Sequence, residues 1–296
     1  MSSASRIAVF LLVQAAAVVA QTGYQDKFIT VKGLRLHYLD WAGGDQSAQN
    51  KPPFIMLHGI GRVAHSFDHI APKFTDKYHV MAIDMRGHGD SGWSPEGAYL
   101  VEDYVRDLEG FVDQLNLRNL TLLGNSTGGR VVQVYAGLHP DRMARLVVED
   151  VGPQRTNEIA SAFARRVQQE ENGWASEDEL VASLTRGGGP ISKELQRNYA
   201  HFGSKRREDG RIVWKRDPNL VKGFVPTELW QYVSKIKCPT IYILGGVSSI
   251  VPPETQDRLK STLPDVRIVT MPGLGHYPHL EAPEEYLRIV QAFLAA

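Results

Sequence analysis

Residues 120–128 read LTLLGNSTG, an apolar run followed at once by a serine between two glycines. A continuous apolar run of this length predicts a strand that is buried on both faces, and the residues after it favour a helix. The G-x-S-x-G pattern places Ser126 on the turn between the two elements, where glycine neighbours let the chain bend without side-chain clashes. The pattern therefore indicates that Ser126 is a nucleophile at the end of a strand.

The same apolar run recurs along the chain and alternates with amphipathic stretches. Strands are predicted at 54–57, 80–83, 120–123, 146–148, 240–244 and 266–270, and helices at about 65–75, 101–116, 127–139, 254–262 and 282–295. Strands that alternate with helices predict an α/β fold with a mostly parallel sheet and helices on both faces. Two alternating strands at 28–31 and 34–39 precede them, which gives eight strands in total.

Residues 154–236 interrupt this alternation. They are rich in charge and carry no buried-strand pattern, and the expected helices are Glu158–Glu171, Glu177–Thr185, Ser192–His201 and Thr227–Lys235. We expect a helical lid here, inserted between the sixth and seventh strands, with 21–153 and 237–296 forming the core. Its aromatic residues could line a substrate cavity, although packing small helices onto the core is the commoner role for any one of them. These residues are Trp174, Trp214, Trp230, Phe163 and Phe202.

Composition excludes several classes of partner and site. The 296 residues contain 33 basic and 33 acidic side chains, so nothing indicates a nucleic-acid partner or a polybasic membrane patch. Cys238 is the single cysteine, which excludes an intrachain disulfide and a metal site built on several thiolates.

The first twenty residues differ from the rest of the chain. Arg6 precedes an apolar stretch that ends in small residues, a pattern that predicts a secretory signal peptide over 1–20, cleaved after Ala20. A secreted or periplasmic protein without a stable membrane anchor after leader removal is expected, or a cytoplasmic one if the leader is not functional. A glycosylation sequon at Asn125 would put a glycan beside Ser126, which favours bacterial export.

Four motifs together resemble one family. They are HGIG at 58–61, DMRGHGDS at 84–91, the serine turn at Ser126 and GHYPHLE at 275–281. In this order, each after a predicted strand, they resemble the α/β-hydrolase superfamily, of the lidded kind that includes carboxylesterases, lactonases and C–C bond hydrolases. The resemblance spans residues 24–296 and implies a mostly parallel eight-stranded sheet with a lid between strands six and seven.

The resemblance assigns roles around the nucleophile. Ser126 needs a base to remove its proton, and His276, in a glycine-rich loop after the last strand, is the candidate. The negative charge that develops on the substrate oxygen needs preorganised N–H donors. The resemblance implies that the amides of Thr127 and Ile60 supply them.

Other polar residues of these motifs are expected to support the loops. This group comprises His58, His88, Asp84, Arg86 and Ser91. His65 and His69 have helical spacing, but without a carboxylate partner they do not indicate a metal site. Arg62 adjoins the loop that contains Ile60 and could reach the pocket, although a solvated arginine is the preferred interpretation.

The acid of the triad departs from the commonest pattern. Many relatives carry an aspartate in the loop after the seventh strand, but residues 245–252 read GGVSSIVP and contain no carboxylate. A serine there cannot supply the negative charge. Another arrangement in the superfamily puts the acid after the sixth strand, where Asp150 is preferred to Glu149, giving the order Ser126, Asp150, His276. A catalytic dyad or an inactive protein remains the alternative.

The sequence thus predicts a serine hydrolase that acts on a small or medium apolar carboxylic ester or lactone through an acyl-enzyme on Ser126. A small ester-like molecule is the expected partner, and neither a cofactor nor a metal is required. A serine at this turn, in place of aspartate, argues against epoxide or haloalkane hydrolysis. The alternatives are a C–C bond or amide hydrolase, a ligand-binding sensor with little turnover, and a cofactor-independent lyase or oxygenase.

Overall fold

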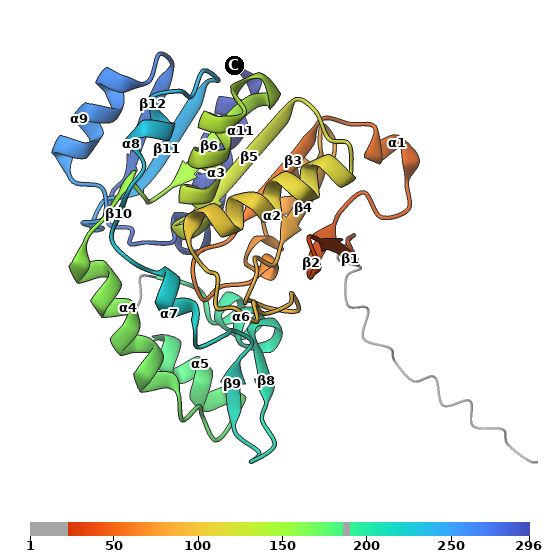
Figure 1. Cartoon of the computed structure of the whole chain (residues 1–296), viewed down its shortest axis with the longest axis vertical. Helices are drawn as coiled ribbons and strands as arrows, with labels where there is room; N and C mark the ends of the chain where they lie inside the picture. Colours follow the sequence, from red (N-terminus) through yellow and green to blue (C-terminus); the bar gives the residue numbers. More distant parts are fainter. Residues whose placement is uncertain (1–22, 186–189) are drawn as a thin grey trace, which may run out of the picture.

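The computed structural model describes residues 23–185 and 190–296, so the expected leader at 1–20 lies outside the described residues. Eight strands form one sheet in the order β1-β2-β4-β3-β5-β6-β11-β12 (Figure 1). The strands are β1 Gln25–Val31, β2 Leu34–Asp40, β3 Pro53–Leu57, β4 His79–Ile83, β5 Leu120–Asn125, β6 Met143–Glu149, β11 Thr240–Gly245 and β12 Val266–Met271.

Within this sheet the strands β3, β4, β5, β6, β11 and β12 run parallel, and only the β1–β2 hairpin is antiparallel to its neighbours. The predicted fold class, a mostly parallel eight-stranded sheet, is confirmed. Because the carboxyl ends of parallel strands meet at one edge, the loops after β3, β5, β6, β11 and β12 all lie at that edge. The four sequence motifs belong to these loops and to the loop after β4.

Helices cover both faces of the sheet (Figure 1). Buried side chains of α2 Val101–Gln114, α3 Thr127–Leu138 and α9 Pro253–Thr262 belong to one apolar cluster, and those of α11 Pro283–Ala295 belong to the other. The helix expected at 65–75 is instead two short 3₁₀ helices, Ala64–Phe67 and Ala71–Phe74. Pro72 explains the break, because proline lacks an N–H and its ring disfavours a preceding helical turn.

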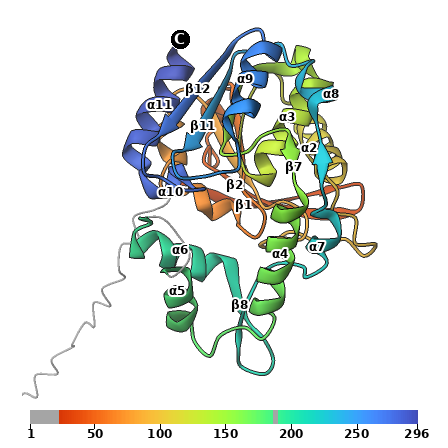
Figure 2. The ribbon, with the colours of Figure 1, turned by 90° about the vertical axis from the view of Figure 1, so that its left-hand side faces the viewer.

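The segment between β6 and β11 stacks against one end of the core (Figure 2). Its helices are α4 Asn157–Glu170, α5 Glu177–Thr185, α6 Lys193–Gly203, α7 Leu220–Gly223 and α8 Trp230–Val233. We call residues 154–236 the inserted segment.

The inserted segment contains short strands as well as the expected helices. Strand β7 (Gln154–Arg155) pairs with β10 (Thr227–Glu228), and β8 (Ser204–Arg206) pairs with β9 (Ile212–Trp214). These strands have two or three residues, too few for an alternating pattern to be recognised. The helix expected over Thr227–Lys235 is therefore a strand in its first part and a single helical turn in its second.

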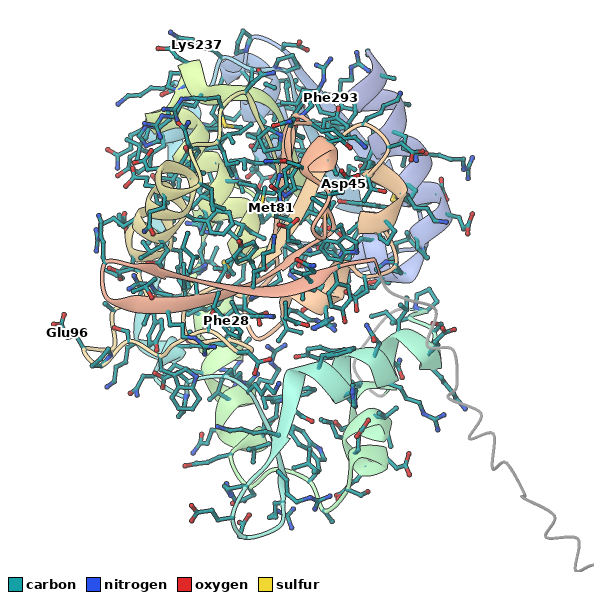
Figure 3. The ribbon with its side chains drawn as sticks, turned by 90° about the vertical axis from the view of Figure 1, so that its right-hand side faces the viewer. Phe28, Asp45, Met81, Glu96, Lys237 and Phe293 are labelled. Atoms are coloured by element: carbon teal, nitrogen blue, oxygen red, sulfur yellow. The ribbon has the colours of Figure 1, made fainter. Side chains whose placement is uncertain are left out.

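The β1–β2 hairpin forms one edge of the sheet and crosses the face of the core that Figure 3 shows. Phe28, on edge strand β1, is 45% exposed, and the guanidinium carbon of Arg35 lies 3.4 Å from the centre of its ring. Within the described ranges, the helices are all too short or too polar to span a membrane.

Candidate active site

Ser126 occupies the turn between β5 and α3 in an unusual backbone conformation. Its φ is +51°, a region that residues with a Cβ rarely adopt, and its amide donates to the Glu149 carbonyl at 3.0 Å. The flanking glycines make this turn possible. A Cβ on Gly128 would lie 2.2 Å from the Leu57 oxygen, and one on Gly124 would lie 2.4 Å from the Gly128 carbonyl. The G-x-S-x-G pattern therefore reflects close backbone approach.

Asp150 and His276 form a hydrogen-bonded pair at the same edge of the sheet. Asp150 follows β6 with φ +44°, is 1% exposed, and its Oδ2 lies 2.7 Å from His276 Nδ1. Burial lowers the pKa of His276, but the hydrogen bond to Asp150 and the negative charges of Tyr277, Asp150 and Glu149 outweigh it and raise that pKa above 6.5. Such a pair leaves Nε2 of the imidazole available to act as a base.

The loop after β11, which lacks a carboxylate, donates hydrogen bonds to Asp150, the residue that follows β6. Ser248 Oγ donates to Asp150 Oδ2 at 2.6 Å, and the Gly245 amide donates to Asp150 Oδ1 at 3.0 Å. The serine in the expected acid position thus supports an acid that comes from the neighbouring strand.

Glu149, the alternative acid, has a different partner. Its Oε1 accepts from the His279 amide at 3.0 Å and lies 2.6 Å from His279 Nδ1, with both side chains buried. Two adjacent acids, Asp150 and Glu149, therefore hold two histidines of one loop. Asn125 binds the same loop, because its Nδ2 donates to the His276 carbonyl at 3.2 Å. Sequence reasoning missed His279, and its spacing of three residues from His276 beside two consecutive acids was the available signal.

The amides of Ile60 and Thr127 remain available to a ligand. Across residues 23–185 and 190–296, no carbonyl or side chain accepts a hydrogen bond from either N–H. The next amide of the loop, that of Gly61, is already used, because it donates to His88 Nε2 at 2.9 Å. The two free donors are therefore those that the family resemblance implied.

Buried imidazoles hold the loop after β3, which contains Ile60, in place. His58 and His88 each have Nδ1 beside a main-chain carbonyl, at 2.8 Å and 2.9 Å, and each accepts a main-chain N–H at Nε2. Burial lowers the pKa of both imidazoles. For His88, burial and the proximity of His58 together lower the pKa to about 3. Both rings are therefore neutral supports rather than competing bases.

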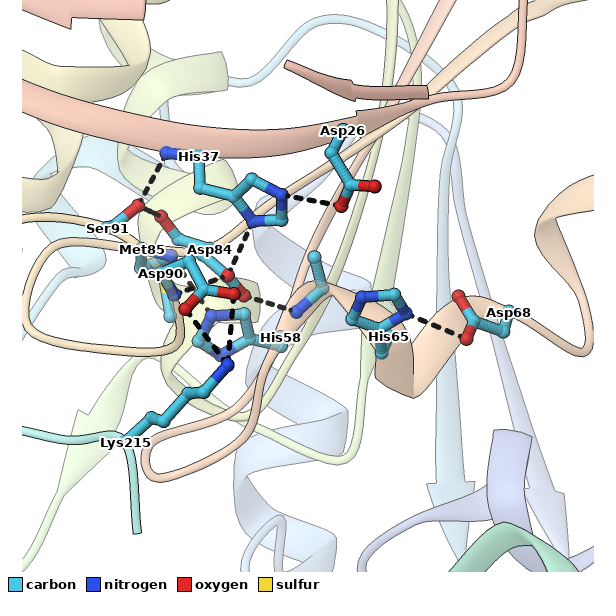
Figure 4. A network of polar contacts seen from close by, with 11 residues as sticks. Asp26, His37, His58, His65, Asp68, Asp84, Met85, Asp90, Ser91 and Lys215 are labelled. Carbon is cyan, nitrogen blue, oxygen red and sulfur yellow. Dashed lines mark hydrogen bonds and ion pairs between the residues drawn. The ribbon is translucent and has the colours of Figure 1, made fainter. Parts of the chain in front are cut away.

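Asp84 organises the loop after β4 (Figure 4). It accepts from the Ala64 amide at 2.6 Å and lies 2.7 Å from His37 Nδ1. Burial raises the pKa of Asp84, but the hydrogen bond and charge of His37 outweigh it and lower the pKa to about 2. Ligand atoms of His37, Asp84 and Asp90 lie within 4.8 Å of one another, but Lys215 Nζ binds both oxygens of Asp90 at 2.9 Å and 3.1 Å. The cluster is thus already paired by a cation of the chain.

His65 and His69 have separate partners despite their helical spacing. His65 Nδ1 lies 2.9 Å from Asp68 Oδ2, whereas His69 Nε2 bonds to the His279 carbonyl at 2.6 Å. The two rings do not converge on one ligand position.

Ser126 and His276 line one cavity of about 250 Å³, whose remaining walls are mostly apolar. Phe163 and Phe224 of the inserted segment belong to its lining. Trp214 lines a second cavity, of about 190 Å³. The other aromatic residues considered above pack elsewhere: Trp174 against Trp214, Trp230 against Arg258, and Phe202 against His65.

Comparison with known proteins identifies the family of this chain. The sequence profile of the alpha/beta hydrolase fold family matches residues 52–283. The chain belongs to this family. It is 28% identical over 266 residues to mouse sn-1-specific diacylglycerol lipase ABHD11, covering 82% of this chain and 81% of that protein. It is 25% identical over 260 residues to Escherichia coli (strain K12) esterase YbfF, covering 84% and 95%.

A solved structure of another hydrolase has the same fold as this chain. The crystal structure of E-2-(acetamidomethylene)succinate hydrolase superposes with a TM-score of 0.83 at 23% identity, covering 92% of this chain and 100% of that one. The relatives named here are esterases and other hydrolases, so the comparisons support a hydrolase with a small-molecule substrate.

Proposed function

We propose that this protein is a serine hydrolase that cleaves a carboxylic ester or lactone through an acyl-enzyme on Ser126. The observation that carries the proposal is the Asp150–His276 pair, 2.7 Å apart, in the loops that border the cavity containing Ser126. The names of the esterase relatives favour an ester over the alternatives that use the same serine, namely amides and C–C bonds.

The reaction follows from the positions of the groups. His276 Nε2 takes the proton of Ser126 as Oγ attacks the carbonyl carbon, and the amides of Ile60 and Thr127 stabilise the oxyanion. The intermediate collapses as His276 gives that proton to the leaving alkoxide. Water then repeats the sequence, which releases the acid and restores Ser126. Asp150 keeps Nδ1 protonated and stabilises the imidazolium.

The inserted segment is proposed to act as a lid, with 21–153 and 237–296 as the core. Side chains of α4 and of the stretch after α7 form part of the cavity that contains Ser126. A substrate bound in this cavity therefore contacts the segment, so the segment is expected to select the substrate.

A fluorophosphonate probe tests the central step. Intact mass should show one adduct per chain, absent in Ser126→Ala, and the protein should hydrolyse apolar nitrophenyl esters. An adduct without ester turnover would favour an amide or C–C bond hydrolase. Folded protein with neither adduct nor turnover would contradict the proposal and favour a sensor. The unlabelled mass of exported protein also tests removal of residues 1–20.

A further inference from the structure

The second cavity adjoins the first at the candidate oxyanion hole. The two cavities share Ile60, Arg166 and Tyr277 in their linings. Ile60 supplies one of the free amides, and Tyr277 follows His276 in the chain. A substrate whose scissile carbonyl lies between Ser126 and Ile60 can therefore extend one arm into the second cavity.

The lining of the second cavity carries an excess of positive charge. Arg62, Arg166 and Arg216 face a single carboxylate, that of Glu170. Arg216 Nη2 bonds to Glu170 Oε2, and Arg166 Nε lies 3.9 Å from Oε1 of the same carboxylate. The excess is local, because the chain as a whole has 33 basic and 33 acidic residues.

Arg62 has aromatic neighbours instead of an acidic partner. Its guanidinium carbon lies 4.2 Å from the ring centres of both Tyr199 and Tyr277. No carboxylate of the described residues forms an ion pair with it. The two rings fix the plane of the guanidinium, and its side-chain hydrogen bond goes to the phenol of Tyr277 rather than to a carboxylate. The expectation that Arg62 is simply solvated is therefore wrong.

Gly61 lets the other two guanidinium groups approach the oxyanion loop. A Cβ at this position would lie 3.0 Å from Arg216 Nη1 and 3.2 Å from Arg166 Nη2. Both groups thus point at the main chain beside Ile60. Arg166 is 44% exposed, so a ligand can reach it, whereas Arg216 is buried against Glu170.

The pKa of Tyr277 reflects the positive electrostatic potential between the two cavities. Burial raises the pKa of its phenol, but the positive charges of Arg62, His276 and Arg166 outweigh burial and lower that pKa to about 7. A site that stabilises a phenolate also stabilises a carboxylate, since both are oxygen anions that accept hydrogen bonds from guanidinium.

The first cavity adds to the same potential. Arg130 and Arg155 line it, are 1% and 6% exposed, and form no ion pair with any described carboxylate. Their hydrogen bonds go to main-chain carbonyls and to Thr227, so their charges tie the inserted segment to the core without being neutralised. Because the two cavities adjoin, these charges also favour an anion in the second cavity.

We propose that the second cavity binds a carboxylate carried by the substrate, with Arg62 and Arg166 as its specificity-determining residues. The proposal rests on the acyl-transfer function proposed above and specifies its substrate class. The substrate is an ester with one apolar arm, held in the cavity of Ser126, and one arm that ends in a carboxylate. Arg216 is assigned a positioning role through Glu170.

Matched ester pairs test this assignment. In the first pair, 4-nitrophenyl valerate and the 4-nitrophenyl monoester of glutaric acid differ only by a terminal methyl or carboxylate on the acyl arm. In the second, 4-methylbenzyl acetate and 4-(acetoxymethyl)benzoate differ in the same way on the alcohol arm. We expect kcat/KM at pH 7 to favour the carboxylate by at least about 10-fold in one pair, as for a charge-assisted hydrogen bond. A preference, in both pairs, for the ester whose arm ends in a methyl group would overturn the proposal.

Arginine variants then locate the preference. Arg62→Gln and Arg166→Gln should each reduce the carboxylate-to-methyl ratio by about 10- to 100-fold, mainly through KM. Arg165→Gln is the matched control, because Arg165 is the exposed neighbour of Arg166 on α4 and lines neither cavity. An unchanged ratio in both variants, with fluorophosphonate labelling retained, would contradict the proposal.

The two proposals fail in different ways. Absence of fluorophosphonate labelling and of valerate hydrolysis would remove the acyl-transfer function. Valerate hydrolysis without any preference for a carboxylate would leave that function intact and remove only the anion site.

Discussion

The core loops and the inserted segment form two walls of one active-site region, and they treat charge in opposite ways. On the core wall the two acids at the end of β6 have fixed partners: Asp150 binds His276 and Ser248, and Glu149 binds His279. On the inserted wall, arginines outnumber carboxylates. Paired charges hold geometry and unpaired charges attract ligands, so the comparison assigns chemistry to the acid–histidine pairs of the core and substrate selection mainly to the inserted wall, with Arg62 as the core's contribution.

The largest expected effect lies on the core wall. Asp150→Asn should lower kcat/KM for an apolar ester by about 10³- to 10⁴-fold, because an amide cannot stabilise imidazolium and favours the wrong tautomer. Initial rates with nitrophenyl esters would measure the loss.

Glu149→Gln is the control for this variant, since Glu149 is the adjacent acid and binds His279 instead. It should cost far less activity and show mainly as lower stability, by about 1–3 kcal/mol, because a buried charged hydrogen bond is weakened. If Glu149→Gln lost as much activity as Asp150→Asn, the assignment of the acid would be wrong.

A smaller effect is expected where the oxyanion loop meets the serine turn. A Cβ on Gly59 would lie 2.6 Å from Asn125 Oδ1 and 3.1 Å from Ser126 Cβ, so Gly59→Ala must displace the loop or the nucleophile. Displacements of about 1 Å cost roughly 100-fold in rate, and we expect a loss of that size, mainly in kcat. Gly44→Ala is the matched control, because a Cβ there meets only Gln25, at 3.9 Å. Equal activity of both variants would show that the loop does not need this close approach.

The inserted wall should affect selectivity more than rate. Phe163 lies in the cavity lining with its ring centre 4.6 Å from that of Phe224. Phe163→Ala should move the preferred acyl chain to greater length and lower kcat/KM for the best wild-type ester by about 10-fold, as for loss of apolar contact in a pocket. Phe202→Ala is the control, since Phe202 stacks on His65 and lines neither cavity. An unchanged chain-length profile in Phe163→Ala would argue against a selective role for α4.

The core and the inserted segment also differ in how much of each could be predicted from the sequence. The strands and the serine turn rest on local patterns, namely apolar runs and glycines where backbones touch. The Asp150 candidate rests on the family resemblance, together with the position of an acid just after a strand. The partner of Glu149 was not predictable in this way, because His279 lies 130 residues further along the chain. Local patterns describe neighbours in the chain, whereas this contact depends on the order of strands in the sheet.

The inserted segment was harder to predict for a related reason. Its strands have two or three residues, and β7 and β10 pair across about seventy residues of intervening chain. Arg62, Arg166 and Arg216 come from three separate stretches, so no spacing indicates that they converge. Arg62 was expected to be solvated because a single arginine in a loop carries no signal of its aromatic neighbours.

The smallest expected effect concerns Tyr277, which contacts both walls. Burial lowers the pKa of His276, and Asp150, Tyr277 and Glu149 raise it. The neutral imidazole is the base, so kcat/KM for an apolar ester should fall as pH drops through this raised pKa. Tyr277→Phe removes one negative charge and should move the acid limb of the profile to lower pH, by a few tenths of a unit up to about one unit. Tyr199→Phe also borders Arg62 but does not act on His276, so it should leave the position of the limb unchanged. A limb that shifts equally in both variants would mean that Arg62, rather than the phenol of Tyr277, sets the titration of the base.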